Sequence, residues 1–222
     1  MTPLEISECL LEQRKKEMQN MTPKHIFHNS NTYTHTLRVA YHANILNSEL
    51  SLPYSEFQQL STACFAHDLG KVETWNPQGS PWFRGHEEVS ADLLIANGFD
   101  KDDDIVNAVR YHGRLQQFDK MGDKARRKLV NKISNLKLFI MLQLCDAEGF
   151  SDYGKTQALK QLQEFVYFVC DDWLLNIFSD TQYPVWVQIV IDDFLLQANM
   201  TEHLPLTNGT PLSYFKPPST SK

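Results

Sequence analysis

An apolar helical segment that ends in an adjacent histidine and aspartate, two side chains able to ligate a metal ion, constrains this chain more than any other feature. Residues 57–66 place apolar side chains at helical spacing, which buries His67 on the core side, and Gly70 stands where the helix is expected to end. An imidazole nitrogen of His67 and a carboxylate oxygen of Asp68 can ligate one divalent cation together, and the second carboxylate oxygen can bridge to another. Four further candidate ligands lie in segments that also have helical spacing: His35, His86, His112 and Asp146.

Hydrophobic periodicity along the rest of the chain predicts an all-α protein, a helical bundle without β alternation or internal repeats. Helices are expected over about residues 4–18, 31–43, 52–67, 86–97, 102–112, 125–145, 154–173 and 184–195. The later half of 125–145 is apolar almost all round, which is typical of a central helix. With 222 residues the chain can bury one sizeable core. We therefore expect a single helical domain over residues 1–203 and a loosely ordered tail, rich in Pro, Thr, Ser and Gly, over 204–222.

Composition and charge narrow the functional classes. The net charge of -6 argues against an extended nucleic-acid surface but is compatible with a small basic site for one phosphate. No apolar run approaches the roughly 20 residues of a membrane span. The N-terminal residues lack a basic-then-apolar signal peptide, so we expect a cytoplasmic protein. The cysteines form no Cys-x-x-Cys pair, and we expect reduced thiols packed as small hydrophobes at Cys9, Cys64, Cys145 and Cys170.

The strings around the candidate ligands resemble those of one known family. They are His35-Thr36-Leu37-Arg38-Val39-Ala40, His67-Asp68-Leu69-Gly70-Lys71, Gly85-His86-Glu87, Tyr111-His112 and Cys145-Asp146-Ala147. Together they resemble the HD superfamily of metal-dependent phosphohydrolases, an all-α family named for the histidine–aspartate pair. The resemblance covers about residues 31–151. Segments 85–91 and 146–149 are most similar to the HD modules of bacterial tRNA nucleotidyltransferases, and the spacing is also similar to that of HD hydrolases of dinucleoside tetraphosphates.

This resemblance implies a centre of one or two divalent transition-metal ions. The first ion is expected to be held by four residues with mixed nitrogen and oxygen donors: His35, His67, Asp68 and Asp146. Such donors suit Mn, Fe, Co, Ni or Zn better than Ca, and Mg is also compatible. His86 and His112, with Asp68 as a bridge, would hold a second ion. Two ions clamp a phosphoryl oxygen and lower the pKa of a bridging water. We therefore expect hydrolysis of phosphomonoester or phosphodiester bonds in a nucleotide or nucleotide-like small molecule.

Two basic residues near these ligands are candidate substrate contacts. Lys71 follows the site helix directly, and Arg84 stands two residues before His86, so both are placed to contact phosphate oxygens. We expect Asp68 and Lys71 to be catalytic and Lys71 and Arg84 to bind substrate, although a solvated role is an alternative for either basic residue.

The sequence indicates the roles of the remaining histidines and of two loop tryptophans less specifically. The four other histidines, which have no such partners, are expected to be structural: His25, His28, His42 and His203. Trp75 and Trp82 lie in a loop rich in proline and aromatic residues, which is expected to roof the site, either by packing or by stacking on a nucleotide base.

Two other functional classes remain open at this stage. The same six ligands are similar to those of di-iron HD oxygenases related to myo-inositol oxygenase, in which the cage activates dioxygen. A third class is a metal-containing nucleotide-binding module without turnover. Iron-dependent oxygen consumption would identify the oxygenase, and retained metal without hydrolysis of a broad panel of phosphate esters would identify the binding module.

Overall fold

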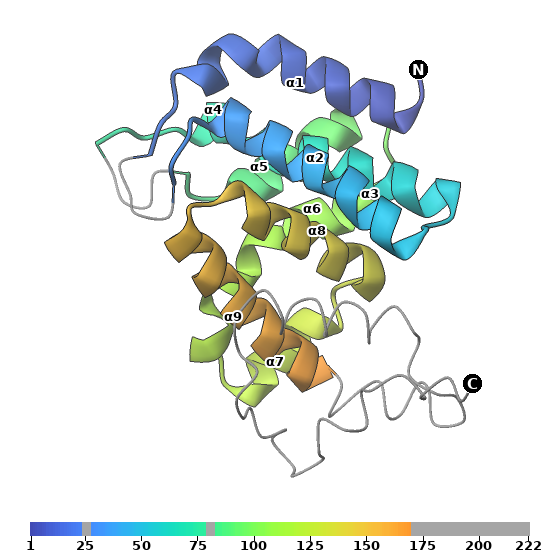
Figure 1. Cartoon of the computed structure of the whole chain (residues 1–222), viewed down its shortest axis with the longest axis vertical. Coiled ribbons are helices and arrows are strands. Elements are labelled where there is room, and N and C mark those ends of the chain that lie inside the picture. Colours follow the sequence, from blue (N-terminus) through green and yellow to red (C-terminus); the bar gives the residue numbers. More distant parts are fainter. Residues whose placement is uncertain (24–27, 79–82, 170–222) are drawn as a thin grey trace, which may run out of the picture.

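Every regular element in the described part of the chain is a helix, which confirms the all-α prediction. The computed structural model describes residues 1–23, 28–78 and 83–169. Its elements are α1 (Pro3–Gln19), α2 (Thr32–Leu50), α3 (Tyr54–Ala66), α4 (Lys71–Thr74), α5 (His86–Ala96), α6 (Asp104–Tyr111), the 3-10 helix η1 (His112–Lys120), α7 (Asp123–Val130), α8 (Leu136–Gly149) and α9 (Asp152–Val169) (Figure 1).

Helix α8 runs between two hydrophobic clusters and contributes to both. The larger cluster joins α8 to α1, α2, α3, α5 and α6, and it includes the fully buried Leu60, Leu94 and Leu142. The smaller cluster joins α8 to η1, α7 and α9 and includes Phe139 and Phe165. In Figure 1, α2 and α3 lie on one side of α8 and α7 and α9 on the other. Because α8 is covered on both sides, its nearly uniform apolar composition is explained.

The predicted helix over 125–145 is wrong in one respect, because the structure divides it into α7 and α8. The side chain of Asn135 accepts a hydrogen bond from the backbone of Leu138 and caps the start of α8. The preceding turn is held by α6, since Asn107 donates to the carbonyl of Lys132 and accepts from the backbone of Ser134. These long-range contacts favour a break over a continuous helix.

The other predicted helices start within two residues of the observed ones where the chain is described, but α2 continues to Leu50, beyond the expected end near residue 43. Asn31 caps α2, as its position predicted. Cys64 and Cys145 are buried, as expected. Cys9 on α1 is exposed, so the prediction that it packs in the interior was wrong. The predicted helix at 184–195, the tail over 204–222, and Cys170, His25, His203 and Trp82 lie outside the described residues.

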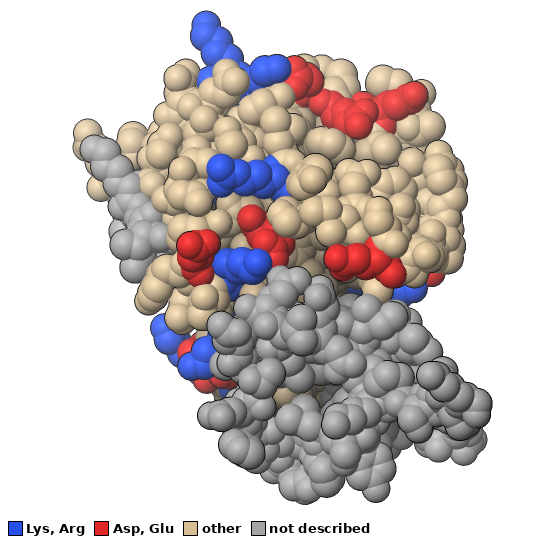
Figure 2. Space-filling model, viewed as in Figure 1, with Lys and Arg blue, Asp and Glu red and all other residues tan. Residues whose placement is uncertain are grey.

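The surface carries charges of both signs. Figure 2 shows Lys and Arg interspersed with Asp and Glu over the described residues on one face. Among the helices of the described ranges, none combines the length and apolar character needed to cross a membrane.

Candidate metal centre

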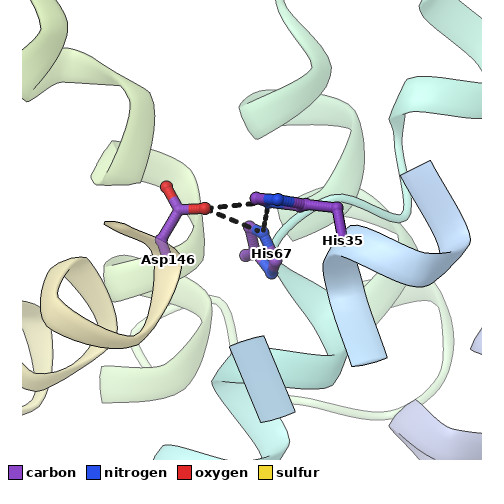
Figure 3. Close-up of side chains that lie close together, drawn as sticks. All are labelled: His35, His67 and Asp146. Atoms are coloured by element: carbon purple, nitrogen blue, oxygen red, sulfur yellow. Dashed lines mark hydrogen bonds and ion pairs between the residues drawn. The ribbon is translucent and has the colours of Figure 1, made fainter. Parts of the chain in front are cut away.

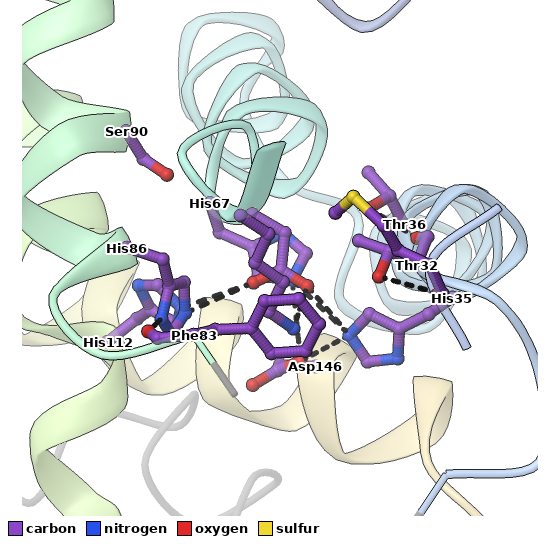
Figure 4. A network of polar contacts seen from close by, with 12 residues as sticks. Thr32, His35, Thr36, His67, Phe83, His86, Ser90, His112 and Asp146 are labelled. Carbon is purple, nitrogen blue, oxygen red and sulfur yellow. Dashed lines mark hydrogen bonds and ion pairs between the residues drawn. The ribbon is translucent and has the colours of Figure 1, made fainter. Parts of the chain in front are cut away.

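Six buried side chains from separate segments meet at one place in the bundle. They are His35 of α2, His67 and Asp68 at the end of α3, His86 at the start of α5, His112 at the start of η1 and Asp146 of α8. Figure 4 shows His86 and His112 on one side of this centre and His35 on the other. The structure therefore brings together all six candidate ligands that the sequence indicated, although they are spread over more than half of the chain.

The first group consists of His35, His67 and Asp146 (Figure 3). The Nε2 atom of His35 lies 3.0 Å from Oδ1 of Asp146, and Nε2 of His67 lies 3.5 Å from the same oxygen. The two Nε2 atoms are 3.4 Å apart. All three potential ligand atoms thus converge on one point, where they could hold a metal ion.

The second group is formed by His86, His112 and Asp68. Nε2 of His86 lies 3.3 Å and Nε2 of His112 lies 3.7 Å from Oδ1 of Asp68. The other carboxylate oxygen, Oδ2, faces the first group instead, 3.3 Å from His67 and 3.5 Å from His35. One carboxylate therefore presents a different oxygen to each group, which is the arrangement that a bridging ligand requires.

Three of the four histidines are oriented by their own backbone. The Nδ1 atom of each lies close to the carbonyl oxygen three residues earlier, at 2.8 Å for His67, 2.8 Å for His86 and 2.6 Å for His112. A carbonyl only accepts hydrogen bonds, so Nδ1 must carry the donated proton. In the neutral ring the lone pair is then on Nε2, which points into the centre, and this is the usual outer hydrogen bond of a metal-binding histidine.

The fourth histidine, His35, is positioned by close packing. Its buried Nδ1 has no hydrogen-bond partner within the described residues. The ring lies against Phe150, with centroids 5.0 Å apart, and against the backbone of Gly149. A Cβ atom at position 149 would overlap Nδ1 and Cε1 of His35, so α8 can approach this ring only with glycine there.

Gly70 brings the two halves of the centre together. A Cβ atom there would overlap the carbonyl oxygen of His86 and lie 2.6 Å from the backbone nitrogen of Ser90. The backbone nitrogen of Gly70 donates to Oγ of Ser90 at 2.8 Å. The sequence suggested glycine for a helix end, but its φ of -72° is open to any residue. Close approach between α5 and the turn that joins α3 to α4 is the reason for glycine, and it places Asp68 beside His86.

The centre has strongly perturbed electrostatics. Burial alone would raise the pKa of Asp146, but hydrogen bonds from His35 and His67 outweigh it and hold the pKa well below its usual range. Burial also opposes ionisation of Asp68, yet the charges of His67 and Lys71 lower its pKa. Burial would lower the pKa of His67, but Asp68 and Asp146 raise it to about 10. Without a cation, the two carboxylates are therefore ionised and His67 is protonated.

The two predicted substrate contacts have different surroundings. Lys71 is buried, and its Nζ atom lies 2.6 Å from Oδ2 of Asp68 and 4.9 Å from the ring centroid of Phe83. Arg84 is exposed, directly before the left-handed Gly85 that precedes α5. The structure thus brings Lys71 into the centre and leaves Arg84 at the surface.

One residue of this region was missed by sequence reasoning. The ring of His28 lies edge-on to His35, with centroids 6.2 Å apart, and edge-on to Phe150 at 5.3 Å. Burial first, and then the charges of Lys71 and His35, lower the pKa of His28 to about 3, against the opposing effect of Asp68 and Asp146. Nothing in the sequence pointed to it, because it precedes α2 in a segment without periodicity.

His42, by contrast, lies away from the centre. It shares the face of α2 that carries His35, but its Nε2 atom lies 3.8 Å from Glu148 and joins no candidate metal group of the described chain.

The fold and the centre define a class of all-helical proteins with a buried histidine–aspartate cage. The family model for the HD domain matches residues 32–142, half of the 222 residues, and the chain therefore belongs to the HD-domain family. HD domains bind divalent metals and are generally metal-dependent hydrolases. The match ends before Asp146, so the place of this residue in the cage comes from the structure. No curated protein and no solved structure matches the chain.

Proposed function

We propose that this protein is a metal-dependent phosphohydrolase that cleaves phosphomonoester or phosphodiester bonds of a nucleotide or a nucleotide-like small molecule. The observation that carries the proposal is the position of Asp68 between two ligand groups, with one carboxylate oxygen facing each. A bridging carboxylate is the element that a two-metal hydrolytic site needs.

The donor atoms fit transition-metal ions. His35, His67, Asp146 and Oδ2 of Asp68 would hold one ion, and His86, His112 and Oδ1 of Asp68 would hold the other. Two donors that each lie about 2.1 Å from one ion are about 3.0 to 3.4 Å apart at octahedral or tetrahedral angles. The observed separations of 3.0 Å between His35 and Asp146 and 3.3 Å between His86 and Asp68 lie in this range. Mixed imidazole and carboxylate donors favour Mn, Fe, Co, Ni or Zn.

When bound, such ions would polarise a phosphoryl oxygen and lower the pKa of a bridging water. The side chains contribute unequally to the two groups, four to the first and three to the second. An ion in the second group would therefore have more coordination positions free for a substrate oxygen. Burial of the whole cage excludes bulk water and strengthens every charge interaction within it.

Lys71 is proposed to stabilise the negative charge that develops on the phosphoryl group. Its ammonium already lies within the centre, 2.6 Å from Asp68, and its burial makes that charge effective at short range. Arg84 is proposed as an outer contact for the substrate, because it lies at the surface between Phe83 and α5.

An aromatic pair beside Lys71 supports a nucleotide-like substrate. Trp75 stacks on Phe83 with centroids 4.8 Å apart and an angle of 28° between the planes. Phe83 is buried, whereas Trp75 is half-buried and keeps part of its ring surface available to a base. The aromatic pair therefore lies where the organic part of a phosphate ester bound at Lys71 would extend.

Metal analysis followed by an activity screen tests this proposal. The purified protein is first analysed for its elements and then assayed for phosphatase and phosphodiesterase activity with added Mn, Co, Ni and Mg. Phosphate release under anaerobic Mn or Co is the expected result. Iron-dependent oxygen consumption without phosphate release would instead assign the protein to the HD oxygenases. Retained metal without turnover would indicate a binding module.

A further inference from the structure

Among the described residues, His28 is the one imidazole beside the centre that belongs to neither ligand group. It lies before α2, and its ring meets the edge of His35 at 78° and the edge of Phe150 at 67°. These two contacts place the ring against the candidate ligand His35 and against Phe150, the residue that follows α8. Within the described residues, no hydrogen bond is formed by its ring nitrogens.

The charged groups that act on His28 are those of the centre itself. They are Lys71, His35, Asp68 and Asp146. His28 contacts the cage at His35 of the first group, and Lys71 contacts it through Oδ2 of Asp68.

We propose that His28 contacts the substrate, its imidazole donating a hydrogen bond to an oxygen of the phosphoryl group held at the centre. An imidazole carries at least one N–H in either protonation state, so this role does not require a change of charge. His28 is partly exposed, which gives a substrate access to it, and its packing on Phe150 limits its rotation. The inference rests on the proposed phosphohydrolase function and adds a residue to its substrate site.

Binding of inorganic phosphate tests this role without requiring turnover. Calorimetric titration of phosphate into the Mn-loaded protein is compared for the wild type, His28→Ala and His28→Asn, with metal content measured for each. Loss of one hydrogen bond to a charged oxygen is expected to weaken phosphate binding about ten- to hundredfold in His28→Ala, with unchanged metal content. His28→Asn is expected to recover part of the affinity, because its amide also donates. His42→Ala, the matched histidine that pairs with Glu148, is expected to bind phosphate like the wild type.

Two results would overturn the role of His28. One is wild-type phosphate affinity in His28→Ala, and the other is loss of metal along with phosphate, which would make His28 a packing support for His35. Failure of the phosphate-ester screen together with weakened phosphate binding in His28→Ala would reject the hydrolase function and leave the His28 contact intact. Hydrolysis by the wild type with an unaffected His28→Ala would reject the contact alone.

Discussion

The backbone of Gly149 lies directly against the imidazole of His35, so closely that no side chain fits between them. A Cβ atom would overlap two ring atoms of His35 and lie 2.8 Å from Cγ2 of Val39. Since His35 has no hydrogen bond at Nδ1 within the described residues, this packing and the contact of Nε2 with Asp146 set the direction of the ring.

Gly149→Ala is therefore expected to displace His35 and weaken metal binding at the first group. Loss of the support of a metal-binding side chain costs roughly 10- to 100-fold in affinity. Competition with a chelating indicator measures this, and the control is Gly122→Ala, where a Cβ atom meets nothing within 4 Å. Wild-type metal affinity in Gly149→Ala would show that the ring of His35 can shift without consequence.

Gln143→Leu tests how α8 supports the second group. The buried amide of Gln143 donates to the carbonyl of His112 at 2.9 Å and so links α8, which carries Asp146, to a ligand of the other group. We expect about tenfold weaker binding of the second ion. Gln163→Leu is a matched control, since Gln163 is also buried but donates to the hydroxyl of Tyr167 within α9. Equal metal affinities of the two variants would rule out this supporting role.

Lys71→Met should separate catalysis from metal binding. Methionine keeps an apolar chain in place of the lysine stem and removes the charge beside Asp68. We expect kcat to fall about 100-fold, with metal content unchanged, as measured by steady-state kinetics on the best substrate of the screen. Lys101→Met, at an exposed turn before α6, serves as the control. A wild-type kcat in Lys71→Met would show that Lys71 does not take part in catalysis.

Metal binding should strengthen as pH rises. In the metal-free protein Asp68 and Asp146 raise the pKa of His67 to about 10, against the effect of burial, so its ring is protonated near pH 7. Because Nδ1 donates to the carbonyl of Cys64, the other proton occupies Nε2, where a cation would bind. The cation must displace this proton, which predicts about a tenfold gain in affinity per pH unit between pH 6 and 8.

Calorimetry in buffers of different ionisation enthalpy measures the proton release directly. About one proton per chain is expected from His67. An affinity for metal that does not change over this pH range would mean that His67 is neutral before the cation binds.

The sequence allowed prediction of most helices and of the residues that meet at the centre. Histidine and aspartate are chemically distinctive, and the strings around His35, His67 and Asp146 resemble those of the HD family, so the ligand set followed from that resemblance. The roles of Gly70 and Gly149 depend on contacts between segments that are distant in the chain. The break between α7 and α8 likewise depends on Asn107 of α6. His28 has no pattern around it, and only its packing against His35 reveals it.

Metal stoichiometry of the wild type and Asp68→Ala tests the central claim most directly. After loading with Mn and removal of free metal, elemental analysis should find about two ions per wild-type chain. Asp68→Ala should retain almost none and lose turnover, with its helical circular dichroism largely intact, whereas the exposed Asp92→Ala should match the wild type. An active, metal-replete Asp68→Ala protein would contradict the assignment of Asp68 as the bridge between the two groups.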